Sequence, residues 1–272
     1  RAYERAIRAS LTPGMTVLEI GTGAGLLAMM AARAGAGHVF TIEENPLMAE
    51  TARRTIAANG LAERITVIEA SSQAVEVGRE LPRPCELLIH EILDVEVLAE
   101  GVLPSVAHAR EALLVEGAPL LPERLWAAGA LSGDPIPGGQ GLGDIEGFDL
   151  SPLALIGAPG QQLSGARGRH RLSPSLPLLE FDLRESPIRL KGAGRARLVA
   201  NAQGRATGVE QWLGFAFPCG TRFTSDRSDS HWGSQFHAFG REVAVTPGQG
   251  VGLEIGHGRT LLYIGLASPD SA

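Results

Sequence analysis

The alternation of apolar runs with helical patterns over residues 1–120 limits the possible folds more than any other feature of this chain. Five runs rich in aliphatic and β-branched residues predict strands, at Met15–Ile20, His38–Glu43, Arg64–Glu69, Cys85–His90 and Ala112–Gly117. Amphipathic segments between them predict helices at Gly25–Gly35, Asn45–Gly60 and Gly101–Ala112. Strands joined by helices pair in parallel, so residues 1–120 are predicted to form an α/β domain with helices on both faces of its sheet.

After Pro119 the pattern changes to short alternating stretches separated by Gly, Pro and Ser. The stretches are Arg124–Leu131, Leu176–Glu185, Ala196–Ala202, Val209–Phe217, Arg241–Pro247, Gly250–Gly258 and Arg259–Ala267. They predict an antiparallel β-barrel or sandwich over residues 121–272. Residues 134–167 are rich in Gly and Pro and too many for an ordinary loop, which predicts an inserted arm or a disordered segment.

Composition excludes some partners and compartments. A net charge of −6 argues against a nucleic-acid partner, since such proteins present basic surfaces. No apolar run reaches the roughly 18 residues of a membrane span, so we expect a cytoplasmic protein without membrane contact. Cys85 and Cys219 lack the spacing of metal ligands, which predicts two buried thiols in a reducing compartment and no metal site.

The sequence VLEIGTGAGLL places Gly21, Gly23 and Gly25 between a predicted strand and a predicted helix. Glycine lets the backbone turn sharply and approach a ligand closely, so these residues form a candidate nucleotide-binding turn. A dinucleotide pattern would require a further glycine where Leu26 stands. The pattern therefore favours S-adenosylmethionine over NAD.

Acidic residues end the first two predicted strands. Glu19 ends the first and Glu43 the second, where a carboxylate is placed to accept hydrogen bonds from two ribose hydroxyls. The alternative for Glu43 is a solvated acid that caps the next helix, a role we assign instead to its neighbour Glu44.

Four carboxylates follow the fourth predicted strand within HEILDVEVLAE, at Glu91, Asp94, Glu96 and Glu100. Acids at this end of a parallel sheet are common, whether for function or for simple solvation. Two close carboxylates repel one another unless a cation lies between them. A guanidinium is such a cation, because its planar fork of N–H donors can pair with carboxylates through charge-assisted hydrogen bonds.

These motifs together resemble the protein arginine methyltransferases, and most closely their monomethylating (type III) branch. The glycine turn, TIEEN (Thr41–Asn45) and the acidic stretch follow the family's order. LLPERLWAAGAL resembles the family's crossing into its barrel, where Pro122 would be a cis proline. SDSHWGSQ resembles its Thr-His-Trp loop, with Ser230 in place of Thr, and GFDLS (Gly147–Ser151) resembles a motif of its dimerisation arm.

The resemblance implies a Rossmann-like S-adenosylmethionine-dependent methyltransferase domain, then an antiparallel β-barrel with a dimerisation arm at about 134–167, forming a homodimer. It implies that the paired glutamates Glu91 and Glu100 clamp an arginine guanidinium and that His231 has a catalytic role. Trp232 would line the arginine pocket, with Asp94 and Glu96 beside it. An acid at Asp94, where dimethylating members have a smaller residue, would restrict the reaction to one methyl group.

Several assignments stay open. Ser72 and Gln73 match the family's adenine-binding turn, although Gln73 replaces a usual glutamate. His231 is otherwise a core histidine, Trp232 barrel packing and Glu96 a surface acid. The family's arginine that grips the cofactor carboxylate would fall at or before Arg1, so that contact is unassigned.

The acceptor is arginine, either as the free amino acid or within a polypeptide. Arg227 lies where it could meet the carboxylate of free arginine, which we slightly favour. A third reading is a non-catalytic scaffold that binds S-adenosylmethionine, and intact Glu91, Glu100 and His231 argue against it.

Overall fold

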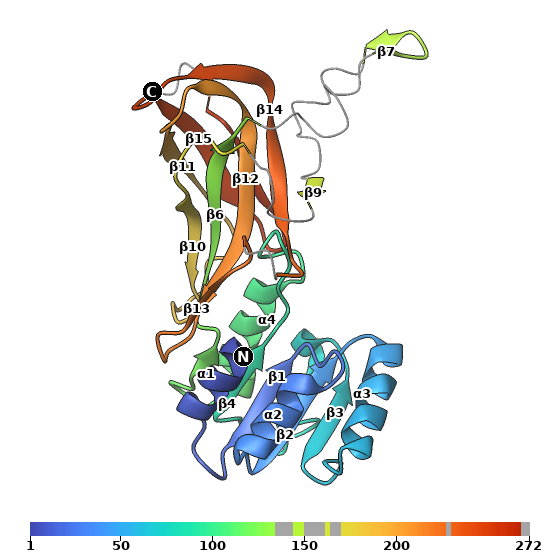
Figure 1. Ribbon diagram of the computed structural model, residues 1–272. Helices are drawn as coiled ribbons and strands as arrows, with labels where there is room; N and C mark the ends of the chain where they lie inside the picture. Colours follow the sequence, from blue (N-terminus) through green and yellow to red (C-terminus); the bar gives the residue numbers. More distant parts are fainter. Residues whose placement is uncertain (134–143, 150–160, 164–169, 227–229, 268–272) are drawn as a thin grey trace.

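The computed structural model describes residues 1–133, 144–149, 161–163, 170–226 and 230–267. Figure 1 shows a parallel sheet with its helices at one end of the molecule and the long antiparallel strands standing above it. No helix in the described part of the chain is long and apolar enough to cross a membrane.

A five-stranded parallel sheet in the order β3-β2-β1-β4-β5 forms the first half of the chain. Its strands are β1 (Thr16–Ile20), β2 (His38–Glu43), β3 (Ile65–Glu69), β4 (Leu87–His90) and β5 (Leu120–Leu121). The helices are α1 (Ala2–Ser10), α2 (Leu26–Ala34), α3 (Pro46–Ala58) and α4 (Val102–His108), with a short 3₁₀ turn at Ser72–Ala74. All residues of β1 and β4 are buried, as expected of central strands covered on both faces.

The structure confirms four of the five predicted strands and corrects the fifth. Residues Ala112–Gly117 do not form a strand; a π-helix at Ala109–Leu113 continues α4, and the fifth strand is the two-residue β5. Its apolar side chain Leu113 is buried on this helix instead. A short apolar run fits either a strand or a buried helix, so hydrophobicity alone could not separate them.

The cap of α3 also differs from the prediction. Asn45, rather than Glu44, is the N-cap, and its side chain accepts hydrogen bonds from the backbone N–H groups of Leu47 and Met48. Pro46 follows at the first helical position, where a missing N–H costs nothing.

Two antiparallel sheets form the second half. The larger has the order β10-β6-β12-β14-β9, with β13 added to β12, and the smaller has the order β11-β15-β16. The larger contains β6 (Arg124–Ser132), β9 (Gln161–Leu163), β10 (Leu176–Asp182), β12 (Gly204–Ala216), β13 (Arg222–Thr224) and β14 (Ser234–Val245). The smaller contains β11 (Gly192–Val199), β15 (Gly250–His257) and β16 (Leu262–Leu266). Each of the seven predicted stretches overlaps one of these strands.

The hairpin β7 (Asp144–Ile145) and β8 (Phe148–Asp149) lies far from the parallel sheet in Figure 1. It contains the first three residues of the GFDLS motif, whereas Leu150 and Ser151 lie outside the described residues, as does most of the predicted arm.

The two halves meet at the Leu121–Pro122 peptide, which is cis as the resemblance implied. His90 is fully buried there, and its Nε2–H donates to the Pro122 carbonyl at 2.9 Å. The Tyr3 hydroxyl of α1 donates to the His90 carbonyl at 2.8 Å, while its ring packs against Phe215 and Phe217 of the barrel. The first helix therefore joins the end of β4 to the barrel.

The cysteine prediction holds for one residue only. Cys85 is buried beside the parallel sheet, but Cys219 is exposed in the turn that follows β12. An apolar side chain in a tight turn has no layer to cover it, which sequence composition does not reveal.

Candidate active site

The carboxyl ends of β1 and β4 bring the glycine turn (Gly21–Gly25) beside the acidic segment that follows β4 (residues 91–101). β1 pairs with β2 on one side and with β4 on the other, so the strand order reverses here. Ile20 lies opposite His90, and the backbone N–H of Glu91 donates to the Ile20 carbonyl at 3.3 Å. Ligands of open α/β sheets bind at such a point, because the loops diverge and leave a crevice.

The glycine turn adopts a backbone that only glycine accepts readily. Gly21, Gly23 and Gly25 have φ values of 87°, 50° and 84°. A Cβ on Gly21 would lie 2.7 Å from Ile92 Cγ2 and 3.3 Å from the Glu91 carbonyl oxygen. The turn is therefore both left-handed and packed directly against the start of the acidic segment.

Glu19 is a fully buried carboxyl beside this turn. Its Oε2 accepts a 2.5 Å hydrogen bond from the Thr41 hydroxyl, while Oε1 has no partner in the described part of the chain. Burial raises the pKa of Glu19 to about 8, with the nearby Glu91 and Glu43 adding to the effect. An unsatisfied acid next to a glycine cradle fits S-adenosylmethionine, whose amino group and sulfonium are both positive.

Glu19 makes the stability of the ligand-free protein depend on pH. Between about pH 4.5 and 8 the folded state keeps the Glu19 proton that the unfolded state releases, so stability should fall as pH rises. Because glutamine does not titrate, the free energy of unfolding should fall less with rising pH in Glu19→Gln than in wild type, by about a few kcal/mol. Denaturant titration at pH 5 and pH 8 measures it, with exposed Glu44→Gln as the control. An equal loss in wild type and Glu19→Gln would contradict the assignment.

Of the other predicted cofactor residues, Glu43 contacts the glycine turn, whereas Ser72 and Gln73 lie in the turn after β3. The Glu43 carboxylate accepts from the backbone N–H groups of Gly23, at 3.2 Å, and Asn45, at 3.0 Å. Ser72 is buried and its hydroxyl donates to Ser105 Oγ of α4, whereas Gln73 is exposed. Glu43 thus bridges the glycine turn and the end of β2, and Ser72 fixes the turn after β3.

Residues 91–101 form an acidic loop that folds back on itself between β4 and α4. The Asp94 carbonyl accepts from the Val97 N–H at 2.9 Å, and its Oδ1 accepts from the Ala99 N–H at 3.3 Å. Val97 has a φ of 72°, which is uncommon for a β-branched residue and marks a tight turn. The turn returns Glu100 toward Glu91, close enough for Glu100 to raise its pKa.

The acids of this loop are held close together without a cation. Burial, and then Glu100, raise the pKa of Glu91 to about 7. Burial raises the pKa of Asp94, and burial together with Asp94 raises those of Glu96 and Glu100, with Glu43 also acting on Glu100. Among the described residues, no Arg or Lys pairs with any of the four loop acids. A bound cation would remove this repulsion.

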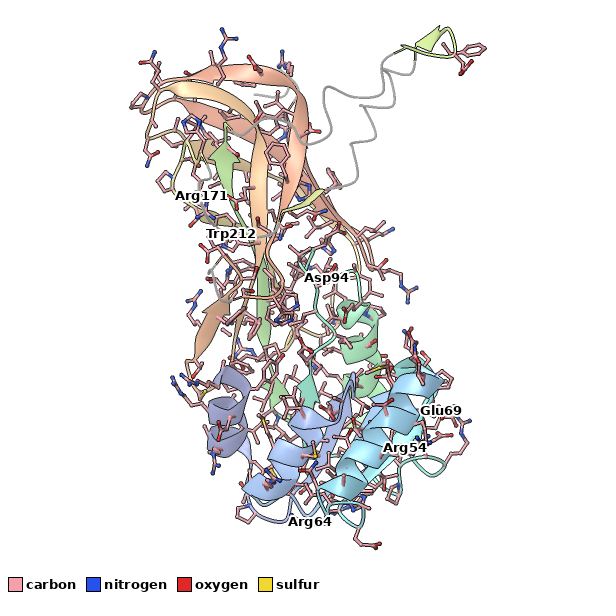
Figure 2. The ribbon with its side chains drawn as sticks, turned by 45° about the vertical axis from the view of Figure 1, so that its right-hand side comes forward. Arg54, Arg64, Glu69, Asp94, Arg171 and Trp212 are labelled. Carbon is pink, nitrogen blue, oxygen red and sulfur yellow. The ribbon has the colours of Figure 1, made fainter. Side chains whose placement is uncertain are left out.

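Three side chains of the barrel hold the loop in place. Trp232 Nε1–H donates to the Leu93 carbonyl, Gln211 Nε2–H to the Val95 carbonyl, and Gln235 Nε2–H to Glu96 Oε1, each at 2.9 Å. Figure 2 shows Asp94 between the barrel strands and the helices of the first domain. The site is therefore built by both halves of the chain.

The two predicted aromatic residues, His231 and Trp232, differ in burial and in their contact with the acidic loop. Trp232 is half-buried against Phe215 and Phe223 and contacts the acidic loop through its N–H. His231 is exposed, and its ring lies on that of Trp232 with centroids 4.1 Å apart. The contacts described for His231 do not include Glu91 or Glu100, and Arg227 lies outside the described residues.

Sequence reasoning missed Tyr3, Thr41, Gln211 and Gln235. Gln211 and Gln235 lie 116 and 139 residues from their partners, so no local pattern marks them. No group of three or more His, Cys, Asp or Glu in the described ranges is arranged to hold a metal ion.

Comparisons with known proteins agree with this geometry. A family model described as ribosomal protein L11 methyltransferase matches residues 3–107. An arginine N(omega)-methyltransferase of Streptomyces achromogenes is 38% identical over 260 residues, covering 94% of this chain and 72% of that protein. Protein arginine N-methyltransferase 7 of Oryza sativa subsp. indica is 41% identical over 140 residues, covering 48% of this chain but only 19% of that protein.

Solved structures show the same fold. The Trypanosoma brucei PRMT1 enzyme-prozyme complex with AdoHcy superposes with a TM-score of 0.82 at 20% identity, covering 99% of this chain and 90% of that one. The likeness extends over both halves, so the parallel sheet and the barrel belong to one known architecture.

Proposed function

The chain belongs to the arginine methyltransferase family, and from this premise we propose that it transfers one methyl group from S-adenosylmethionine to a terminal guanidino nitrogen of arginine. The observation that supports the acceptor is the acidic loop. Burial and Glu100 raise the pKa of Glu91, burial, Asp94 and Glu43 raise that of Glu100, and no basic side chain of the described residues pairs with either acid. A guanidinium matches that need in charge, shape and donors.

In the proposed reaction, S-adenosylmethionine would supply an electrophilic methyl group and leave as S-adenosylhomocysteine, and the attacking guanidino nitrogen would release one proton to solvent. Glu91 and Glu100 hold the guanidinium, drawing its positive charge away from one terminal nitrogen and orienting that nitrogen for attack. Glu19, Glu43 and the glycine turn hold the cofactor, with Ser72 and Gln73 near the adenine. Trp232 closes the pocket against the loop. Such a transfer depends chiefly on positioning and on fixed electrostatics.

We assign the restriction to one methyl to Asp94. Its carboxylate accepts a hydrogen bond from the Ala99 N–H in the turn between the paired glutamates. The barrel contacts to Leu93, Val95 and Glu96 hold the backbone on either side of it. A second methyl would enlarge the substrate, and in this proposal the Asp94 carboxylate occupies the space that the larger substrate would need. Glu96 supports the loop by accepting from Gln235 and is a weaker candidate for direct substrate contact.

For the acceptor we favour free L-arginine. A Streptomyces relative that covers 94% of the chain is named arginine N(omega)-methyltransferase, whereas relatives named protein arginine N-methyltransferase 7 cover 48% to 64% of it. We also propose a homodimer formed through the arm, of which the β7–β8 hairpin and β9 are the described parts.

Product mass separates these readings. The protein is incubated with S-adenosylmethionine and either free arginine or an arginine–glycine peptide. We expect free arginine to give a product about 14 mass units heavier, which corresponds to one added methylene. Turnover of the peptide alone would overturn the free-arginine proposal.

Replacing Asp94 with Gly should allow a second methyl group. We expect wild type to stop at the monomethyl product and Asp94→Gly to form dimethylarginine, at a rate lowered by roughly tenfold or more because the loop loses a turn contact. Mass spectrometry of long incubations measures it. Dimethylarginine from wild type would refute the role of Asp94.

A further inference from the structure

Residues on both sides of His231 and Trp232 interact, directly or through one carboxylate, with the guanidinium of Arg171, which lies outside the site. Asp226 lies shortly after β13, which ends at Thr224, and Ser234 is the first residue of β14. Arg171 comes from a distant part of the chain, just before β10. Figure 2 shows it close to Trp212 on the barrel.

The link to Ser234 runs through a buried carboxylate. Arg171 Nε–H donates to Glu210 Oε2 at 2.8 Å, and Ser234 Oγ–H donates to the other oxygen, Glu210 Oε1, at 2.9 Å. The Glu210 side chain is 1% exposed. A carboxylate so buried needs a paired charge, and its two oxygens thereby join Arg171 to the start of β14.

The link to Asp226 uses the other end of the guanidinium. Arg171 Nη1 lies 3.6 Å from Asp226 Oδ2, and Oδ1 of the same carboxylate accepts from the Thr224 hydroxyl at 2.6 Å. The Arg171 guanidinium stacks over the Trp212 ring, 4.4 Å from its centroid. A planar fork held on an aromatic face can serve two carboxylates at once, which a lysine ammonium cannot reproduce.

Strand β12 connects the Arg171 contacts with the acidic loop, because neighbouring residues of this strand contact each of them. Glu210 and Gln211 are consecutive, so their side chains leave opposite faces of the sheet. Glu210 meets Arg171, while Gln211 donates to the Val95 carbonyl. Trp232 reaches the Leu93 carbonyl from the segment between Asp226 and Ser234.

We propose that Arg171 is a positioning residue for arginine binding. By pairing with Asp226, and with Glu210 that in turn binds Ser234, it fixes described residues on both sides of Trp232, so that the indole keeps its hydrogen bond to the Leu93 carbonyl of the acidic loop. This inference rests on the proposed function for its kinetic consequence, but the fixing of the segment is independent of it. Arg171 touches neither substrate nor cofactor in this role.

The test uses a double variant, because removing Arg171 alone would take a positively charged partner away from the buried Glu210 carboxylate. In Arg171→Met with Glu210→Gln both charges are absent and Ser234 keeps an acceptor. We expect the KM for arginine to rise at least about tenfold, with kcat changing less and the affinity for S-adenosylmethionine within about twofold. Arg171→Lys should give an intermediate rise, since it restores charge but not the fork.

The matched control is Arg205→Met, which removes an exposed Arg205–Glu242 pair on the same two strands, β12 and β14. It should leave both constants unchanged. Thermal unfolding establishes that each variant folds, and hydrogen exchange of residues 230–236 should quicken in the double variant but not in the control.

An unchanged KM together with unchanged exchange in a folded double variant would overturn the proposal. If wild type methylates neither free arginine nor the peptide, the proposed function fails instead. The exchange measurement on the protein with S-adenosylhomocysteine then still decides whether Arg171 fixes the segment.

Discussion

Replacing Glu91 or Glu100 with Gln is expected to lower kcat/KM for arginine by roughly 10²–10³-fold, because each change removes one carboxylate from a pair aimed at a positive substrate. Glutamine keeps the size of the side chain and one acceptor oxygen, so the fold should survive. Relief of repulsion should even stabilise the ligand-free protein slightly, since burial and Glu100 raise the pKa of Glu91 to about 7. Initial rates with arginine varied at saturating S-adenosylmethionine measure the effect.

Glu69→Gln is the matched control for this prediction. Glu69 also ends a parallel strand, but it is exposed and paired with Arg53 at 3.1 Å, as an acid placed for solvation would be (Figure 2). Its replacement should leave the rate within about twofold. Full activity of Glu91→Gln and Glu100→Gln would refute the guanidinium clamp. Equal losses in all three variants would point to a general effect of charge.

Gly21→Ala should weaken binding of S-adenosylmethionine by at least about tenfold and lower stability by about 1–2 kcal/mol or more. The added Cβ would meet Ile92 Cγ2 at 2.7 Å and the Glu91 carbonyl oxygen at 3.3 Å, at a backbone with a φ of 87°. Relief of that contact requires the acidic loop to move, so the KM for arginine should rise as well. Calorimetric titration of the cofactor and steady-state kinetics measure the two effects.

Gly60→Ala separates strain from contact. Gly60 has a φ of 68°, but a Cβ there meets nothing within 4 Å, and it follows α3 away from the site. This variant should lose stability by a similar strain cost and keep its affinity for S-adenosylmethionine. If Gly21→Ala binds the cofactor as tightly as Gly60→Ala does, the glycine turn is not the cofactor cradle.

The sequence pattern predicted the helices and strands whose formation depends on residues close together in the chain. The runs containing Leu18 and Leu88 read as strands because central parallel strands are apolar throughout, and both are fully buried. Pro46 marked the start of a helix for a similar reason. At the sheet edge the pattern failed: β5 has two residues, too few to show a period, and the neighbouring apolar residues belong to a π-helix.

The placement of the candidate site's residues was predictable where one segment carries them, and not where distant segments meet. Gly21 and Glu91 each follow a strand with a recognisable motif, and adjacent strands bring them together. Gln211 and Arg171 lie in ordinary barrel sequence, and their roles arise from contacts with residues far along the chain. Such contacts depend on how the barrel strands pack, so they are seen only in the three-dimensional structure.

The bracing of the acidic loop by Trp232, Gln211 and Gln235 has an evolutionary consequence. Substitutions in the barrel can shift the loop backbone and retune which arginine derivative is accepted, while the acids that we propose bind the guanidinium stay untouched. Divergence of substrate range within this lineage is then open to mutations at positions that never meet the substrate. Conversely, a barrel grafted from a distant relative would have to supply three compatible donors before the first domain could recognise its acceptor.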